Sequence, residues 1–207
     1  MRYSLLLPLR PLASRFTLLL SAGMAVSVSA STLIMNAVII DGSGAPPEQG
    51  SVRISDSRIV AKGDLIPLDT DTVIDAAGYV LAPGFIDTHS HADALILSQR
   101  EALPKVTQGI TTVIVGQDGE SPYPLSGFFT ALEQRPAKIN VAAFAGHNTL
   151  RNEVMHPDAN RSANEAEVGA MQVLLQSELA AGALGLSSGL EYEPGIYSTP
   201  AEVLLLA

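Results

Sequence analysis

The feature that most constrains the fold is an alternation of short apolar runs and helical stretches over the second half of the chain. A helix pattern is clearest in residues 163–181, where apolar side chains recur at helical spacing. Strand followed by helix, repeated four times, indicates parallel βα units. The expected strands are residues 79–88, 110–115, 139–145 and 183–187, and the expected helices are residues 92–108, 124–135, 163–181 and 199–203.

Polar, glycine-containing segments stand at the carboxyl ends of these expected strands, at residues 87–91, 116–119, 146–148 and 187–192. A (β/α)8 barrel places its chemistry at those ends. An open doubly wound sheet uses the same ends, but no glycine-rich phosphate loop follows the first strand. We therefore predict a barrel, of which residues 81–207 supply about four units. Because a barrel needs eight units, the sequence predicts a truncated first half.

The segment before the barrel pattern, residues 31–80, has a different texture of short β-rich runs. Residues 32–40 form one run that ends at a turn cluster in residues 41–44, and three shorter runs follow at residues 51–55, 58–60 and 72–74. We predict a small antiparallel sheet in a β-sandwich-like domain.

The first 30 residues have the order of a secretory signal. Arg2, Arg10 and Arg15 give a basic start, residues 16–28 are largely apolar, and small residues lead to Ala30. We predict a signal peptide cut after Ala30 and an exported, periplasmic or secreted protein. A membrane anchor is the alternative, although the apolar run is shorter than the roughly 20 residues that span a bilayer.

Charge and composition exclude several function classes. Three of the 12 basic residues fall within residues 1–30, so nine basic and 21 acidic residues remain, a formal charge of −12. Such a surface repels nucleic acid and anionic lipid, so we expect neither as a partner once the signal is removed. The chain has no Cys and no Gly-x-Ser-x-Gly elbow. Metal-activated water, for which an amide carbonyl is a fitting target, is the chemistry that remains.

His89 and His91 are the strongest candidates for metal ligands. They lie two residues apart at the end of the first barrel strand, so their side chains share one face, with Asp87 one step behind. Two imidazoles on one face can hold Zn²⁺ or a similar metal. The alternative is a pair of surface histidines in a loop.

Three further residues stand at later strand ends. Asp118 is either a metal ligand at the same mouth or a turn residue bonded to nearby amides. His147 either lines the pocket and binds substrate or is a structural histidine. Tyr192 either donates a hydrogen bond to a substrate carbonyl or carboxylate or packs at the rim.

These motifs resemble the D-aminoacylases, the N-acyl-D-amino-acid deacylases of the amidohydrolase superfamily. The most specific segment is Gly-Ala-Leu-Gly-Leu-Ser-Ser-Gly-Leu-Glu-Tyr at residues 182–192. The other matching segments are residues 33–42, 84–93, 105–113 and 146–151.

The resemblance implies an amidohydrolase-type (β/α)8 barrel beside a small β domain, and one or two zinc ions at the barrel mouth. It implies hydrolysis of the linear amide of an N-acyl-D-amino acid. The family's first-strand histidine pair corresponds to His89 and His91, and its second-strand ligand, usually Cys, corresponds to Asp118. This departure promotes Asp118 from a turn residue to an expected ligand.

The same resemblance places the family's other ligands, its general base and its substrate-binding Arg on later strands, beyond Ala207. We therefore expect the 207 residues alone to be inactive. Two alternatives stay open. The first is another amidohydrolase, a cyclic amidase or a deaminase, although none of Lys62, Lys105 and Lys138 ends the fourth strand to bridge two metals. The second is an inactive truncated secreted remnant.

Overall fold

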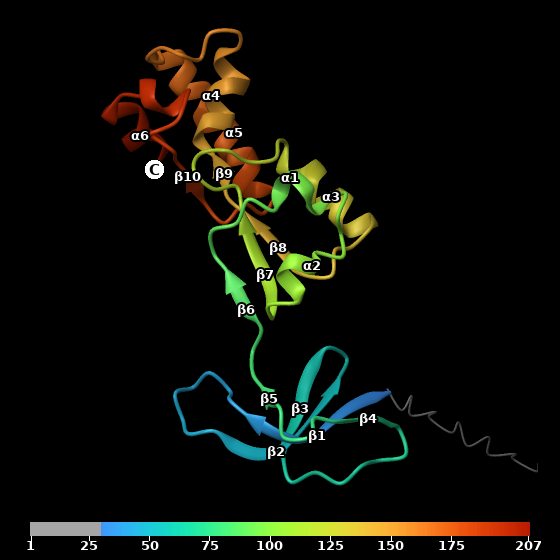
Figure 1. The fold of residues 1–207 in the computed structure, drawn as a ribbon. Helices are drawn as coiled ribbons and strands as arrows, with labels where there is room; N and C mark the ends of the chain where they lie inside the picture. Colours follow the sequence, from blue (N-terminus) through green and yellow to red (C-terminus); the bar gives the residue numbers. More distant parts are fainter. Residues whose placement is uncertain (1–29) are drawn as a thin grey trace, which may run out of the picture. The chain divides into compact units, whose positions relative to one another are not determined.

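The computed structural model describes residues 30–207, which form two compact units that meet in sequence at Leu81 and Ala82 (Figure 1). The predicted signal peptide, and with it the alternative of an anchor there, falls on residues 1–30 and so lies almost wholly outside the described residues. Among residues 30–207, no helix is both long enough and apolar enough to cross a membrane.

The first unit is one five-stranded sheet in the order β3-β2-β1-β4, with β5 also paired to β1. β1 pairs antiparallel with β2 but parallel with β4 and β5, so the expectation of an antiparallel sheet was wrong for those two strands. The chain returns to β1 through the loop between β3 and β4 instead of a hairpin, which sets the parallel direction. The described residues of this unit form a single sheet, and the expected sandwich-like domain stays a prediction. The strands are β1 Ser31–Ile39, β2 Glu48–Ser55, β3 Arg58–Gly63, β4 Asp71–Asp75 and β5 Val80–Leu81.

Apolar residues on one face of β1 and β2 form the centre of this sheet. Ala37, Ile39 and Val52 are buried together, and Leu33 is fully buried on β1. Asp71 at the start of β4 accepts a bidentate contact from Arg53, with a shortest distance of 2.8 Å. This contact, with the hydroxyl of Ser31, holds the pKa of Asp71 well below its usual range.

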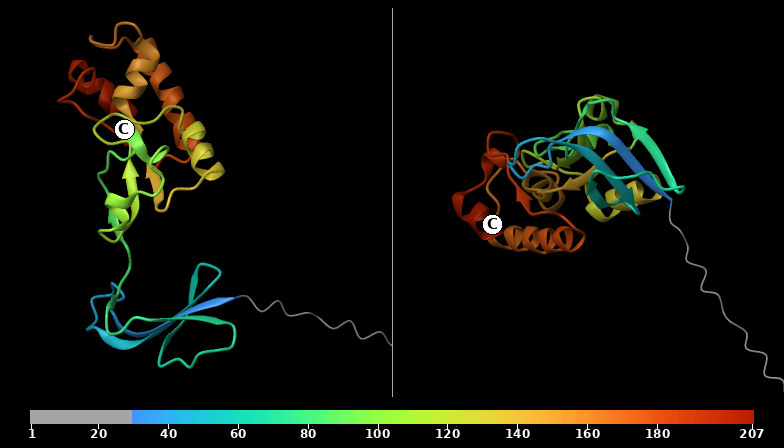
Figure 2. Two further views of the ribbon diagram at one scale, coloured as in Figure 1. Left: turned by 45° about the vertical axis from the view of Figure 1, so that its right-hand side comes forward. Right: turned by 90° about the horizontal axis from the view of Figure 1, so that it is seen from below.

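The second unit contains two short parallel sheets covered by helices (Figures 1 and 2). One sheet has the order β6-β7-β8, and β9 pairs with β10 in the other. The elements are β6 Phe85–Asp87, α1 Asp93–Ile96, α2 Leu103–Val106, β7 Ile110–Val115, α3 Leu125–Gln134, β8 Asn140–Ala143, β9 Ala145–Gly146, α4 His147–Met155, α5 Glu165–Ala180, β10 Leu186–Ser187, the 3-10 turn Gly195–Tyr197 and α6 Pro200–Leu206.

The expected third strand, residues 139–145, is divided at Phe144. Its first part, β8, pairs with β7, and its second part, β9, pairs with β10. Backbone bonds from Phe144 N to Val115 O (3.0 Å) and from Ala145 N to Gly185 O (2.9 Å) carry the chain from one neighbour to the next. The four strand regions therefore lie side by side in chain order and parallel, which is a mixed α/β arrangement of successive βα units.

The helices of the second unit are shorter or more numerous than the pattern predicted. Residues 92–108 form two short helices, α1 and α2, because the chain turns between them and Ala102 adopts a left-handed φ of 45°. α4 was not expected at all. It packs beside α5, as Figure 2 shows.

Two apolar clusters hold the sheets and helices together. Val113, Val115 and Ala143 from the β6-β7-β8 sheet pack with Leu125 and Phe128 of α3. A second cluster joins α4, α5 and α6 through residues that include Leu150, Met171, Leu175 and Leu206.

One buried carboxylate supports the start of α3. α3 follows Pro124, which offers no capping side chain, and the backbone N–H of Leu125 donates instead to Glu178 Oε2 of α5 at 2.8 Å. This bond satisfies a helix N-terminal donor that would otherwise be buried without a partner.

Candidate metal centre

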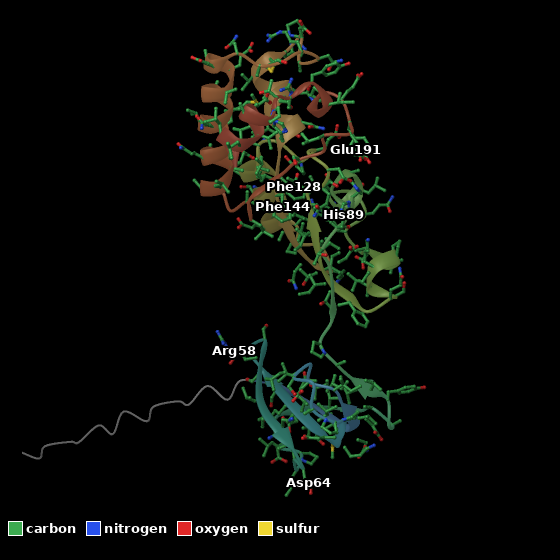
Figure 3. All side chains as sticks on the ribbon, turned by 90° about the vertical axis from the view of Figure 1, so that its left-hand side faces the viewer. Arg58, Asp64, His89, Phe128, Phe144 and Glu191 are labelled. Atoms are coloured by element: carbon green, nitrogen blue, oxygen red, sulfur yellow. The ribbon has the colours of Figure 1, made fainter. Side chains whose placement is uncertain are left out.

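The candidate ligands sit at the carboxyl ends of two paired parallel strands. His89 and His91 follow β6, and Asp118 follows β7 (Figure 3 labels His89). Asp87, the last residue of β6, is opposite Val113 of β7 in the register. Parallel pairing therefore brings the two loops to the same edge of the sheet.

The three side chains converge on one point. Asp118 Oδ2 lies 3.2 Å from Nε2 of His89 and 3.2 Å from Nε2 of His91. The ligand atoms of all three residues lie within 4.8 Å of one another. The histidine side chains are 59% and 64% exposed and that of Asp118 is 36% exposed, so packing leaves their donor atoms accessible.

This geometry fits a divalent metal such as zinc. Zinc binds histidine nitrogen and carboxylate oxygen at about 2.0–2.2 Å, so tetrahedral ligand atoms lie about 3.3 Å apart. The observed 3.2 Å from Asp118 to each imidazole agrees with that spacing. Three protein donors with one exposed side match a catalytic site, which keeps a coordination position open.

The carboxylate of Asp87 is hydrogen-bonded to neighbouring groups and supports the histidine segment. Its Oδ2 accepts from Lys105 Nζ at 2.6 Å, and its Oδ1 faces the backbone N–H of His89 at 3.4 Å. The hydrogen bond from Lys105 lowers the pKa of the Asp87 carboxyl. Asp87 therefore anchors the start of the histidine segment and is not one of the converging donors.

Gln117 ties the two ligand loops together. Its side-chain amide donates to Thr88 O at 2.9 Å and to Ile114 O at 3.0 Å, so it bridges the ends of β6 and β7. Gln117 is buried beside half-buried Asp118. Sequence reasoning missed this residue, since nothing distinguishes a bridging Gln from a solvated one before the strands are paired.

A cavity of about 360 Å³ opens beside the cluster. It is lined by His91, Gln117, Asp118, Glu120 and Tyr192. The structure thus brings Tyr192, which is 55% exposed, to the same cavity as two of the three candidate ligands. Glu120 is a second lining residue that sequence reasoning did not single out.

His147 lies in a different environment. It is the first residue of α4, is 1% exposed, and its Nε2 is 2.9 Å from Glu202 Oε1 of α6. Arg151 also contacts Glu202 from within α4. The structure does not bring His147 to the converging donors or to the cavity lining, so its predicted substrate contact stays a prediction.

Residues 72–202 match the model of the amidohydrolase family, and the matched range contains all three converging side chains. The chain belongs to the amidohydrolase family.

Three individual amidohydrolases show more specifically what this chain is similar to. N-acyl-D-aspartate deacylase of Alcaligenes xylosoxydans xylosoxydans is 41% identical over 83% of this chain and 39% of its own. The crystal structure of N-acyl-D-glutamate deacylase from Bordetella bronchiseptica, complexed with zinc and a phosphonate inhibitor, is 37% identical with a TM-score of 0.81, over 86% of this chain and 42% of that one. A D-aminoacylase structure described for its binuclear metal centre is 36% identical with a TM-score of 0.78, over 84% and 42%.

These amidohydrolases confirm the resemblance to the D-aminoacylases that the sequence motifs indicated. The chain spans about 40% of the length of the relatives that it matches. The structural agreement over that part confirms a mixed α/β fold of the D-aminoacylase kind.

Proposed function

We propose that this chain carries the first metal ligands of a hydrolase that removes the acyl group from N-acyl-D-amino acids. The observation that carries the proposal is the convergence of His89, His91 and Asp118 at one edge of the sheet. Similarity to deacylases named for N-acyl-D-aspartate and N-acyl-D-glutamate supports the substrate class.

A bound divalent ion would lower the pKa of a water molecule and polarise the amide carbonyl. The two imidazoles supply neutral nitrogen donors, and Asp118 supplies an anionic oxygen that offsets part of the ion's charge. Tyr192 lines the cavity with Asp118 and His91, which suits its phenol to donate a hydrogen bond to a substrate carbonyl or carboxylate. We propose zinc, with one or two ions, as the resident metal.

We further propose that the strand regions β6, β7, β8 with β9, and β10 are the first four strands of a (β/α)8 barrel in residues 81–207, with residues 31–80 as a separate small β domain. Support comes from their parallel order and from the ligands at their carboxyl ends. A crystal structure of the full-length protein with these strands in an open doubly wound sheet would contradict the barrel.

Substrate assays on the full-length protein test the proposed activity. Release of the free amino acid is measured with the N-acetyl derivatives of D-Asp, D-Glu and D-Leu, with the L-enantiomers as matched controls, and with a hydantoin. We expect release from D-substrates, loss of activity with a chelator and recovery with Zn²⁺. Opening of the hydantoin ring without deacylation would indicate a cyclic amidase. Absence of turnover with every substrate would support the alternative of an inactive secreted remnant.

Export is a separate proposal. It rests on the basic, apolar and small order of residues 1–30. We expect the mature protein to be recovered outside the cytoplasm with Ser31 as its first residue. N-terminal sequencing of the recovered protein checks this, and an intact Met1 on protein found in the cytoplasm would contradict it.

A further inference from the structure

We infer that Ser187 and Gly189 are positioning residues for Asp118, and that they set metal affinity by fixing the Asp118 loop, residues 116–119. The inference rests on the proposed metal centre. It concerns a segment that lies about 70 residues further along the chain and supplies none of the three converging donors. Contacts from this segment fix both ends and the middle of the Asp118 loop.

Ser187 clamps the two ends of the Asp118 loop. Its hydroxyl donates to Gly116 O at 2.6 Å and accepts from the backbone N–H of Gly119 at 3.2 Å. One side chain therefore satisfies an acceptor and a donor on either side of Asp118. Ser187 itself is held on β10, which pairs with β9 through the opposed residues Ser187 and Gly146.

Gly189 fixes the middle of the loop by contact. A Cβ on Gly189 would lie 1.9 Å from the carbonyl oxygen of Asp118 and 2.5 Å from its carbonyl carbon. Both atoms belong to the backbone, so no side-chain rotation relieves the overlap. Any larger residue at position 189 must change the separation between its own backbone and the backbone that carries the Asp118 carboxylate.

The Asp118 loop needs such support because its backbone is strained. Asp118 has a left-handed φ of 54°, and Gly119 follows with a φ of 83°. A non-glycine residue in this region persists when the surroundings over-determine it. Thr149 N of α4 adds a third tie by donating to Gly119 O at 3.1 Å. The third and fourth βα units thus hold a ligand that the second unit supplies.

Because Ser187 holds the Asp118 loop, removing its hydroxyl should lower metal affinity more than it lowers the stability of the fold. Partners that orient a metal ligand typically change metal affinity by about 10–100-fold when removed. Ser187→Ala removes both hydrogen bonds but leaves the three donors in place. We expect Zn²⁺ affinity to fall within that range, while the melting temperature of the metal-free protein changes little.

The test uses the full-length protein and Zn²⁺ titration by calorimetry in competition with a chelator. Ser188→Ala is the matched control, because Ser188 is exposed and makes no side-chain hydrogen bond within residues 30–207. Ser187→Thr keeps a hydroxyl and should bind close to wild type. Visible absorption of the Co²⁺-loaded proteins reports coordination geometry without requiring turnover, and Ser187→Ala should change that spectrum.

The outcomes separate this inference from the proposed function. Both the metal centre and the positioning role are supported if wild type and Ser188→Ala bind Zn²⁺ tightly while Ser187→Ala binds it more weakly and has an altered Co²⁺ spectrum. Equal affinities and spectra for Ser187→Ala and wild type overturn the positioning role and leave the metal centre standing. Wild-type protein that binds neither ion overturns the metal centre and the inference together.

A second variant covers the case in which Ser187→Ala folds poorly. Gly189→Ala forces the backbones of Asp118 and residue 189 apart by contact alone and deletes no hydrogen-bonding group of Ser187. We expect it to weaken Zn²⁺ binding at least as much as Ser187→Ala does. Wild-type affinity in folded Gly189→Ala would overturn the inference.

Discussion

Two histidine–carboxylate contacts in the second unit have nearly the same geometry and opposite surroundings. His89 lies 3.2 Å from Asp118 and His147 lies 2.9 Å from Glu202. The side chains of His89 and Asp118 are 59% and 36% exposed, whereas each side chain of the second pair is 1% exposed. A contact between a histidine and a carboxylate therefore does not identify a ligand site by itself, because the surroundings of the two side chains decide their chemistry.

The buried pair is completed by a cation. Arg151 contacts Glu202 and also donates to the backbone carbonyl of Ala159 at 2.9 Å. Burial lowers the pKa of His147 despite the neighbouring carboxylate. The pKa of Glu202 is also lowered, because hydrogen bonds from Arg151 and His147 outweigh the opposing effect of burial. The buried group is therefore a neutral imidazole that donates to a carboxylate, and Arg151 also contacts that carboxylate.

The exposed pair is completed by a second imidazole. His91 approaches the same oxygen of Asp118, and the two rings meet edge-on with centroids 5.5 Å apart. Two imidazoles thus share one carboxylate oxygen, and His91 and Asp118 of this group line the cavity.

Breaking the buried cluster should cost the most stability. Arg151→Met leaves Glu202 buried without its cation, which typically costs about 3–5 kcal/mol of folding free energy. Protonated His147 can replace part of the lost charge, so the loss should be larger at pH 8 than at pH 6. Urea unfolding checks both statements. Arg161→Met is the control, since its contact with Glu167 is more exposed and should matter far less.

Removing an exposed ligand should affect metal binding and leave stability nearly unchanged. His89→Ala deletes one of three donors, so Zn²⁺ affinity should fall at least about 100-fold, the upper end of the loss for outer partners. The free energy of unfolding without metal should change by about 0.5 kcal/mol or less, as for other surface substitutions. Tight Zn²⁺ binding by the His89→Ala variant would show that the exposed pair is not a ligand site.

The buried histidine should give the protein a pH-dependent stability. Its pKa is lowered from 6.5 in the folded state, so its contribution is present above pH 6.5 and is lost as pH falls towards the folded value. The slope should not exceed about 1.4 kcal/mol per pH unit for this one proton. Unfolding free energies at pH 7.5 and 5.5 measure it, and His147→Gln should flatten the slope. An equal slope in both proteins would contradict a buried neutral imidazole.

Replacing the carboxylate of Asp118 should have the smallest effect, a change in which metal ions the site prefers. Asp118→Cys substitutes a soft thiolate for a hard oxygen donor, so the ratio of Cd²⁺ to Mn²⁺ affinity should rise. Competition titrations with the two ions measure this ratio. An unchanged ratio would mean that position 118 does not contact the ion. Glu120→Cys is the control, because Glu120 lines the same cavity but is not one of the converging donors.

The sequence predicted β7, α3 and α5 well because each has a continuous apolar pattern. It missed α4, since the helix buries Asn148 and Arg151, polar residues that interrupt the apolar periodicity. It also treated residues 139–145 as one strand, because nothing local marks the change of neighbour at Phe144.

His89 and His91 could be chosen from the sequence because they lie two apart just after an expected strand. Asp118, which follows β7 in the loop, was read from the residues alone as either a ligand or a turn residue, and only the family resemblance promoted it to an expected ligand. The contacts of Gln117 and Ser187 could not be predicted, because both depend on which loops meet after the strands pair. Burial of His147 depended in the same way on α6, which brings Glu202 to it.

We propose that His89, His91 and Asp118 bind one metal ion. X-ray absorption at the zinc edge of the Zn²⁺-loaded full-length protein tests this most directly, with wild type compared against a His89→Ala, His91→Ala double variant. We predict nitrogen and oxygen scatterers at about 2.0–2.2 Å in wild type, with imidazole scattering that is reduced or absent in the variant. Identical imidazole scattering in the two proteins would contradict the account.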